Sequence, residues 1–420
     1  MQRIVHISSL VTQKDTTNVY DSLHRILSLW SVISNESSLR TKLDTMKQEA
    51  NKALIDFYKV LATGFNLSNR LAGLRREMSA MEIDGMLVIK PENRIYLSGF
   101  LGSSAYLVVG KDQAVLLTDF RYVQQAKEQA RDFTVIKHTP AWMDSLPEVL
   151  AAAGVQRLGF EQDYLTYAQY SELKQYLSAE LIPTSGLVET LRQVKDEQEL
   201  AYMQQATDIA EAAFAEIVSK VAAGRTEAEI AFDLEIAMRR RGAEGVSFPI
   251  ISASGPRSSL PHGAPTERIL QEGDFLTLDF GAAVHGYRSD MTRTVVLGQP
   301  SERQLEIYRI VQKAQLAAEQ AVRPGIPGKT VDKVARDIIT EAGYGQYFGH
   351  GLGHGVGLQI HEGPSAGMRG ETILQPGMIV TVEPGIYIPD FGGVRIEDMV
   401  MVTADGHKNF NYSSKELIMV

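Results

Sequence analysis

The stretch FLTLDFGAAV, residues 275–284, alternates apolar and polar side chains in the way that predicts a β-strand. Successive side chains of a strand point to opposite faces, so Thr277 and Asp279 share the face opposite Leu278. The segment RTVVLG, residues 293–298, follows as a second strand. We therefore expect a strand pair that presents Asp279 on the side away from an apolar core.

The same order of elements is expected twice between residues 191 and 420. Each strand pair follows two helices whose apolar residues recur at three-and-four spacing. The predicted helices are residues 194–223, a helix with the capping box Thr226 and Glu229, a helix opened by Ser301 and Gln304, and a helix from Thr330 to Gly343. The second strand pair is MIVTVEPGIYI, residues 378–388, and GVRIEDMVMV, residues 393–402. We interpret this region as an internal duplication of helix, helix and hairpin.

Each half of the duplication contributes two acids. Alternation places Glu383 and Glu397 opposite the apolar faces of the second pair, and Asp290 precedes the second strand of the first pair. If the halves pack about a pseudo-two-fold axis, these acids converge with Asp279. Four carboxylates in a partly buried place repel one another unless protons or cations neutralise them. Two divalent ions balance four charges, and an added histidine makes the set suitable for Mn, Co, Fe or Zn.

One acid at a strand end is usually a solvated surface group, but four in this arrangement favour a site. Three of the nine histidines, His350, His354 and His361, also lie in the glycine-rich stretch HGLGHGVGLQIHEG, residues 350–363. Glycine loses much conformational freedom on folding and offers no side chain to pack, so a packing role explains this stretch poorly. We expect substrate and ions to approach its main chain.

The part of the chain before residue 191 is divided into two regions. Residues 67–190 alternate helical stretches with short apolar strands such as GMLVI and AYLVV, which predicts an α/β domain. Residues 1–66 are slightly basic and have helical apolar spacing between about residues 21 and 61. We interpret them as a helical extension of unknown role, with packing or oligomer formation as the default.

Composition excludes several classes of protein. The net charge of -9 over 420 residues argues against general nucleic-acid binding. Cysteine is absent, which excludes disulfides and thiolate chemistry and fits the cytoplasm. No apolar run reaches the roughly 18 residues of a membrane span. The GPSAG match to GxSxG, residues 363–367, has no preceding apolar strand, so a serine hydrolase is not favoured.

Five ordered motifs, LTLDFGA, SDMTRT, GHGLGHGVGLQIHE, TVEPGIY and GVRIED, resemble those of the pita-bread metallopeptidases. This family includes methionine aminopeptidase, Xaa-Pro aminopeptidase and prolidase. Residues 67–190, with NRIYLSGFLGSSAYLVV, resemble the creatinase-like N-terminal domain of its proline-specific branch. The resemblance implies an α+β protein in which a creatinase-like α/β domain precedes a pita-bread catalytic domain, residues 191–420. Residues 1–66 depart from the family pattern.

The resemblance also implies a ligand set for two divalent ions. Asp279 would bind one ion, Asp290 and Glu397 would bridge the two, and His354 with Glu383 would complete the other. Every ligand of the family motif is present. Mn²⁺ is the favoured metal, with Co²⁺ or Zn²⁺ as alternatives, and the ions would activate water for attack on a peptide carbonyl.

Further roles follow from the same resemblance. Glu383 would act as general base and then general acid. His361 would stabilise the tetrahedral intermediate, and His262 would line the substrate pocket and assist catalysis. His350 and Arg395 correspond to positions that contact substrate or relay protons, although Arg395 could instead pair with a ligand carboxylate.

The implied activity is that of a dinuclear metal exopeptidase. We expect an Xaa-Pro aminopeptidase, which removes the N-terminal residue from peptides with proline in second position. Prolidase activity, limited to Xaa-Pro dipeptides, is the alternative. Methionine aminopeptidase is less favoured because of the added N-terminal domain and His350, and a non-catalytic binding module that keeps the fold is a further alternative. Relatives imply a homodimer.

Overall fold

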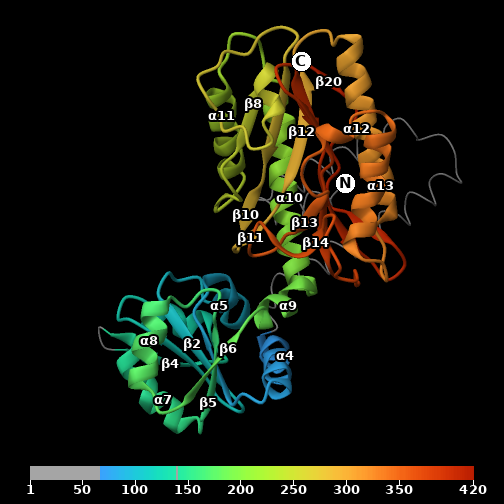
Figure 1. Cartoon of the computed structure of the whole chain (residues 1–420). Coiled ribbons are helices and arrows are strands. Elements are labelled where there is room, and N and C mark those ends of the chain that lie inside the picture. Colours follow the sequence, from blue (N-terminus) through green and yellow to red (C-terminus); the bar gives the residue numbers. More distant parts are fainter. Residues whose placement is uncertain (1–66, 139–140) are drawn as a thin grey trace, which may run out of the picture.

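The computed structural model describes residues 67–138 and 141–420, which form two lobes (Figure 1). The predicted extension of residues 1–66, with its helices, lies outside the described residues. The smaller lobe begins at residue 67, and the long helix α10 leads from the junction into the larger lobe. No helix in the described part of the chain has both the length and the apolar character needed to cross a membrane.

The smaller lobe is built around a six-stranded sheet with the order β4-β3-β2-β1-β5-β6. The pairs β3–β4, β1–β5 and β5–β6 are parallel, whereas β1–β2 and β2–β3 are antiparallel. The strands are β1 (Gly85–Val88), β2 (Ala105–Gly110), β3 (Ala114–Thr118), β4 (Thr134–Lys137), β5 (Arg157–Glu161) and β6 (Glu180–Thr184). The helices are α4 (Leu67–Ala80), α5 (Pro91–Ser98), α6 (Val123–Gln129), η1 (Trp142–Ser145), α7 (Leu146–Ala152), α8 (Tyr167–Tyr176) and α9 (Leu187–Gln193).

Helices cover both faces of this sheet, which explains why its central strands are almost wholly apolar. Met86 and Val88 of β1 belong to one core, and Leu87 between them belongs to the other. All three side chains are at most 1% exposed. The predicted short apolar strands therefore form the centre of a layered α/β sheet.

The first half of the larger lobe has the predicted order of two helices and a strand pair. Its elements are α10 (Glu197–Val218), α11 (Glu227–Arg240), β7 (Gly245–Val246), β8 (Ile251–Ser254), η2 (Gly255–Ser259), β9 (Phe275–Phe280), β10 (Ala282–Val284), β11 (Tyr287–Arg288) and β12 (Met291–Val296). Helix α10 starts three residues later than expected, because Asp196 and Glu199 form a capping box. The predicted capping box of Thr226 and Glu229 opens α11.

The second half repeats this order. Its elements are α12 (Glu302–Ala321), α13 (Gly328–Glu341), η3 (Gly345–Tyr347), β13 (Gly353–Gly355), β14 (Glu362–Ala366), β15 (Ile379–Val382), β16 (Gly385–Ile388), β17 (Gly392–Arg395), β18 (Asp398–Val402), β19 (His407–Asn409) and β20 (Ile418–Met419). The predicted capping box of Ser301 and Gln304 opens α12. Helix α13 begins two residues before Thr330.

Both predicted strand pairs are interrupted where the acids lie. Strand β9 pairs with β12, and a separate sheet containing β10 and β11 follows after Gly281. Strand β15 pairs with β18, whereas β16 pairs with β17 beyond Pro384. Proline has no N–H to donate, so it ends a ladder. At Gly281 a Cβ would collide with the carbonyl of Ser289, so only glycine allows the main chain to pass this close to Ser289.

The two halves meet through strand β12 and the segment that leads from β17 to β18. Thr292 forms a bridge with Glu397, and Thr294 exchanges hydrogen bonds with the main chain of Arg395. Thr292 is also the register partner of Asp279. One side of the interface between the halves is therefore lined by acids from both hairpins, as the duplication predicts.

Candidate metal centre

The four acids occupy equivalent places in the two hairpins. Asp279 lies near the end of β9, and Asp290 immediately precedes β12. Glu383 immediately follows β15, and Glu397 immediately precedes β18. Asp279, Asp290 and Glu397 are buried, and the Glu383 side chain is 15% exposed. The hairpin geometry thus brings carboxylates 118 positions apart in sequence to one place in the interior.

His354 of β13 completes the cluster. Its Nε2 lies 3.3 Å from Oε1 of Glu383 and 3.7 Å from Oδ2 of Asp290. Asp290, His354 and Glu397 each offer one ligand atom, and these atoms lie within 4.8 Å of one another. The structure therefore brings together a histidine and acids from both halves, which the sequence analysis singled out as ligands.

Asp279 has a different immediate partner. Its Oδ2 accepts a hydrogen bond of 2.6 Å from Nη2 of Arg395. Its buried Oδ1 has no hydrogen-bond partner in the described part of the chain. A buried carboxylate oxygen without a donor is costly, and a cation is one way to compensate it.

The carboxylates perturb one another strongly. Burial, reinforced by the charge of Asp279, raises the pKa of Asp290 well above its ordinary value. Burial and the charge of Asp290 do the same to the pKa of Glu397. Without a cation, both carboxyl groups would therefore hold protons, as expected when like charges share a site.

His354 and Glu383, unlike Asp290 and Glu397, stabilise each other's charged forms. Burial alone would lower the pKa of His354, but the hydrogen bond and charge of Glu383 outweigh it and raise that pKa to about 9. Burial would raise the pKa of Glu383, but its partner His354 lowers it to about 2. The pair is thus an imidazolium and a carboxylate when no cation is present.

This donor set fits divalent ions. Four carboxylates and one imidazole supply oxygen and nitrogen ligands, and a cation would replace the protons that the cluster otherwise retains. The unpartnered oxygen of Asp279 supplies a further donor atom. The predicted ligands Asp279, Asp290, His354, Glu383 and Glu397 are therefore chemically compatible with the two expected ions.

Two threonines that the sequence analysis did not single out hold the acids in place. The Thr381 hydroxyl donates to Oε1 of Glu383 at 2.9 Å and accepts the N–H of His354 at 3.0 Å. The Thr292 hydroxyl donates to Oε2 of Glu397 at 2.6 Å. The available signal was strand alternation, because Thr381 shares a strand face with Glu383.

The remaining predicted residues surround the cluster in two groups. His361 is exposed, and its ring lies 4.4 Å from that of His354 at an angle of 80°. Burial lowers the pKa of His361, and the charges of His354 and His262 lower it further, so it is neutral near pH 7. His262 lies in an exposed turn after η2. His361 and His262 therefore border the site on its solvent side.

His350 and Arg395 converge on a residue that the sequence did not single out, Tyr387. The Tyr387 hydroxyl lies 2.9 Å from Nε2 of His350 and accepts from Nη1 of Arg395 at 2.9 Å. Arg395 also donates to Asp279, so the alternative of pairing with a ligand carboxylate is present in the structure. Contact of His350 or Arg395 with substrate stays a prediction.

Two glycines in residues 350–363 allow neighbouring main-chain segments to come close. A Cβ on Gly353 would collide with the carbonyl oxygen of Thr381, and one on Gly355 would collide with that of Gly363. Neighbouring main-chain segments therefore approach these two glycines, and the approach of substrate and ions to the rest of the stretch stays a prediction. The close contact brings β13, which carries His354, directly against β15 and β14.

Comparisons with known proteins match two domain families to the chain. Residues 201–404 match metallopeptidase family M24, and residues 70–194 match the creatinase/prolidase N-terminal domain. An Xaa-Pro dipeptidase from Pyrococcus furiosus is 39% identical over 355 residues, which cover 84% of this chain and all of that protein. The predicted creatinase-like and pita-bread fold is confirmed.

Solved structures with the same fold cover most of this chain. An Xaa-Pro dipeptidase from Bacillus anthracis is 47% identical with a TM-score of 0.83, and the match covers 84% of this chain and 100% of that one. An X-Pro aminopeptidase from Thermotoga maritima is 36% identical with a TM-score of 0.78, and the match covers 83% and 99% of the two chains. These matches do not separate a dipeptidase from an aminopeptidase.

Proposed function

We infer, because this chain belongs to metallopeptidase family M24, that its acid cluster hydrolyses the peptide bond before proline in Xaa-Pro dipeptides. The chain is a hydrolase of the metallopeptidase class, and the choice of substrate is our proposal. The observation that carries the proposal is the convergence of Asp290, His354 and Glu397 within 4.8 Å. The similarity to proteins named Xaa-Pro dipeptidases supports the choice of substrate.

Asp279, Asp290, His354, Glu383 and Glu397 would hold two divalent ions, for which we propose Mn²⁺. When bound, the ions supply Lewis acidity and make hydroxide available near neutral pH. Oxygen-rich ligation and the absence of cysteine favour such a metal over softer ones, and Co²⁺ or Zn²⁺ are the alternatives.

Glu383 is the proposed general base. It lies at the partly exposed side of the cluster, where it can accept a proton from the attacking water and return one to the leaving amine. The Thr381 hydroxyl fixes one of its oxygens, Oε1, and leaves Oε2 for this task. The low pKa of Glu383 keeps this carboxylate ionised in the metal-free site.

His361 and His262 are proposed to act on the substrate carbonyl and the substrate pocket. Neutral His361 has one ring N–H to donate toward the oxygen that becomes negative in the tetrahedral intermediate. Its place beside His354, on the exposed side, is where a carbonyl entering from solvent would lie. His350, held by Tyr387, is the proposed substrate contact on the other side.

The Xaa-Pro aminopeptidase expected from the sequence stays the second candidate. The T. maritima structure, which is named an X-Pro aminopeptidase, supports it. We rank the dipeptidase first because the relatives named as dipeptidases include the more similar B. anthracis structure.

A comparison of Ala-Pro with Ala-Pro-Ala tests this ranking. Purified full-length protein loaded with Mn²⁺ should release alanine rapidly from Ala-Pro and at least about 100-fold more slowly from the tripeptide, because a pocket that closes after proline excludes a third residue. Comparable release from the tripeptide would establish the aminopeptidase instead. Glu383→Ala is the control, and undiminished turnover in that variant would refute the role of Glu383.

Two further proposals concern the state of the protein. We propose a cytoplasmic homodimer: the absence of cysteine supports the cytoplasm, and the family resemblance implies the dimer. Light scattering of the full-length chain measures the oligomeric state directly. Metal analysis after Mn²⁺ loading tests the binding-module alternative, which predicts less than one equivalent of metal.

A further inference from the structure

A buried polar connection links the smaller lobe to the segment that carries His361. Arg192 lies in α9, at the junction of the two lobes, and Lys195 follows three residues later. Both contact Glu362, the residue directly after His361 and the first residue of β14. About 170 positions separate these cations from Glu362 in the sequence, so only folding brings them together.

The contacts on Glu362 are shielded from water. Lys195 Nζ donates to Oε1 of Glu362 at 2.9 Å, and Arg192 Nη2 donates to Oε2. The side chains of Arg192, Lys195 and Glu362 are 2%, 0% and 5% exposed. Although burial alone would raise the pKa of Glu362, the charges of Lys195 and Arg192 outweigh it and lower that pKa. Glu362 is thus an ionised carboxylate with a cation on each oxygen, the arrangement in which charged hydrogen bonds are strongest.

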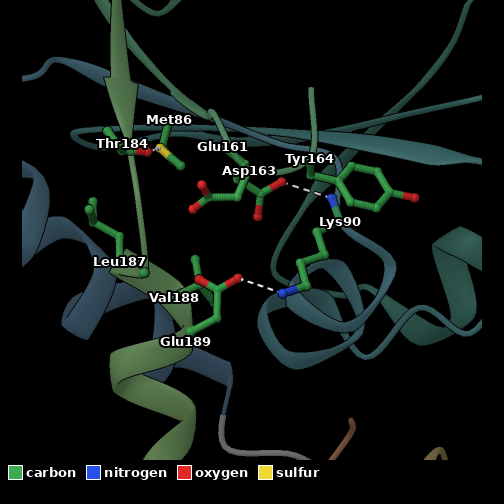
Figure 2. A pocket seen from close by; sticks show the side chains of 10 residues that line it. Met86, Lys90, Glu161, Asp163, Tyr164, Thr184, Leu187, Val188 and Glu189 are labelled. Carbon is green, nitrogen blue, oxygen red and sulfur yellow. Dashed lines mark hydrogen bonds and ion pairs between the residues drawn. The ribbon is translucent and has the colours of Figure 1, made fainter. Parts of the chain in front are cut away.

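Arg192 is itself fixed from the smaller lobe. Its Nη1 donates to Oδ1 of Asn93 at 2.8 Å, and the Asn93 amide donates to Glu161 at 2.6 Å and Glu189 at 2.9 Å. Figure 2 shows Glu161 and Glu189 in the wall of a cavity, whose volume is about 40 Å³. There the main-chain N–H of Lys90 donates to Glu161, and its Nζ donates to Glu189. A cavity of this size holds a few water molecules at most, so it does not accommodate a peptide.

Glu362 in turn fixes the turn that precedes it. Its Oε2 accepts the N–H of Gln359, and Gly355 next to His354 is its register partner across the β13–β14 pair. The junction also touches the neighbouring main chain, because a Cβ on Gly363 would lie 2.7 Å from Nε2 of Gln193 in α9. The residues on both sides of His361 therefore rest on groups from the lobe junction.

We propose that Arg192 and Lys195 are positioning residues, which hold His361 at the reaction site by clamping Glu362. The smaller lobe thereby takes part in catalysis, because its Asn93, held by Glu161 and Glu189, sets the position of Arg192. This inference rests on the proposed function for the role of His361. It adds that the lobe junction sets the position of that histidine.

The contacts of Arg192 and Lys195 with Glu362, called the clamp below, position His361, the proposed stabiliser of the transition state. Loss of the clamp should therefore lower kcat and leave KM nearly unchanged. A displacement of about 1 Å at a reacting group costs up to about 100-fold in rate. We expect kcat to fall about 10-fold to 100-fold in Arg192→Gln and in Lys195→Gln, with KM within about 3-fold. Each variant leaves one cation on Glu362, so the buried carboxylate keeps a partner and the protein should fold.

Arg70→Gln is the matched control. Arg70 of α4 also crosses the lobe junction, pairs with Asp196 at 2.7 Å and has a side chain that is 3% exposed. Its hydrogen bonds and ion pairs to Asp196, Tyr96 and Glu199 involve groups outside residues 353–366. A general loosening of the junction should affect all three variants equally, whereas a clamp on Glu362 should spare Arg70→Gln. Arg192→Lys, which keeps the charge, should recover part of kcat.

Two measurements on Mn²⁺-loaded full-length protein decide the proposal. Hydrogen exchange of residues 353–366 should accelerate in Arg192→Gln and Lys195→Gln but not in Arg70→Gln. In a His361→Ala background, Arg192→Gln should lower kcat by less than about 2-fold, because the clamp has nothing left to position. An unchanged exchange rate, an unchanged kcat, or the same loss of kcat with and without His361 would each overturn it.

The exchange measurement also separates this inference from the proposed function. If the wild-type protein cleaves no Xaa-Pro peptide, the proposed function fails, while accelerated exchange in the two clamp variants alone still shows that the junction holds this segment. If the wild type cleaves Ala-Pro and the clamp variants match it in kcat, the proposed function stands and the positioning role of Arg192 and Lys195 is refuted.

Discussion

Replacing Thr381 by valine removes one hydroxyl and almost nothing else, so it isolates the contact that orients the general base. The Thr381 side chain is fully buried, and its hydroxyl bonds both Glu383 and the N–H of His354. A hydrogen bond to a charged group contributes about 1.5 to 3 kcal/mol, and a buried N–H left without a partner costs about 1 to 3 kcal/mol. The substitution should therefore loosen the orientation of the Glu383 carboxylate and lower the free energy of unfolding.

We expect kcat on Ala-Pro to fall about 10-fold to 100-fold in Thr381→Val, which corresponds to about 1.4 to 2.7 kcal/mol of lost transition-state stabilisation. The free energy of unfolding of the metal-free protein, measured by urea titration, should fall by about 1 to 3 kcal/mol. Thr381→Ser keeps the hydroxyl, so its kcat should stay within about 3-fold of the wild type.

Thr277→Val is the matched control for this prediction. Thr277 is also buried and also lies two residues before an acid on a strand, but its hydroxyl bonds Thr294 at 3.1 Å instead of the acid. Its replacement should leave kcat within about 3-fold of the wild type. A Thr381→Val enzyme with wild-type kcat, or a Thr381→Ser enzyme as slow as Thr381→Val, would refute the orienting role of the hydroxyl.

Three further predictions concern the metal and the charges. Chelation with EDTA should abolish turnover of Ala-Pro and lower the Tm, and added Mn²⁺ should restore both, because cations bind only the folded cluster; an EDTA-treated, metal-free enzyme that keeps full activity would contradict the ligand set. Glu397→Gln removes a carboxyl group that the metal-free cluster keeps protonated near pH 7 at a cost to folding, so we expect a higher Tm for the metal-free protein but weaker Mn²⁺ binding by calorimetry. A lower Tm would contradict this cost. The raised pKa of His354, about 9 against an ordinary value near 6.5, means that its contribution to stability is complete below about pH 6.5 and lost as pH rises through about 9. Urea unfolding of metal-free protein at pH 6, 7.5 and 9 should show this decline, with a shallower one in His354→Asn; equal slopes for the two proteins would contradict it.

The positions of the acids could be predicted from sequence because they depend on local rules. Strand alternation alone places Asp279 and Glu383 on polar faces, and the repeated order of elements indicates that the halves pack together. The capping boxes at Thr226 and Ser301 were equally local, since the motif specifies both the cap and its partner three residues later. Local patterns therefore determined most of the element order.

The interruption of the hairpins was not predictable in this way. MIVTVEPGIYI looks like one continuous strand, and only the pairing partners show that β15 pairs with β18 while β16 pairs with β17. Tyr387 was missed for a related reason. Its alternation marks it as an ordinary strand residue, and its role depends on contacts with His350 and Arg395 from other segments. The pairing of Arg192 with Glu362 depends on the docking of two lobes, for which one sequence gives no signal.

The glycines of residues 350–363 connect these observations. A strand that must place a histidine beside an acid on the next strand can do so only if the two main chains come close. At Gly353 the space that a Cβ would fill is occupied by the carbonyl oxygen of Thr381, the same residue whose hydroxyl bonds Glu383 and the N–H of His354. An alanine at position 353 would push β13 away from β15 and lengthen the hydrogen bond that the His354 N–H donates to the Thr381 hydroxyl. The glycine therefore serves the metal centre indirectly, because it sets the separation at which one hydroxyl can orient the proposed base and hold the main chain of the proposed ligand.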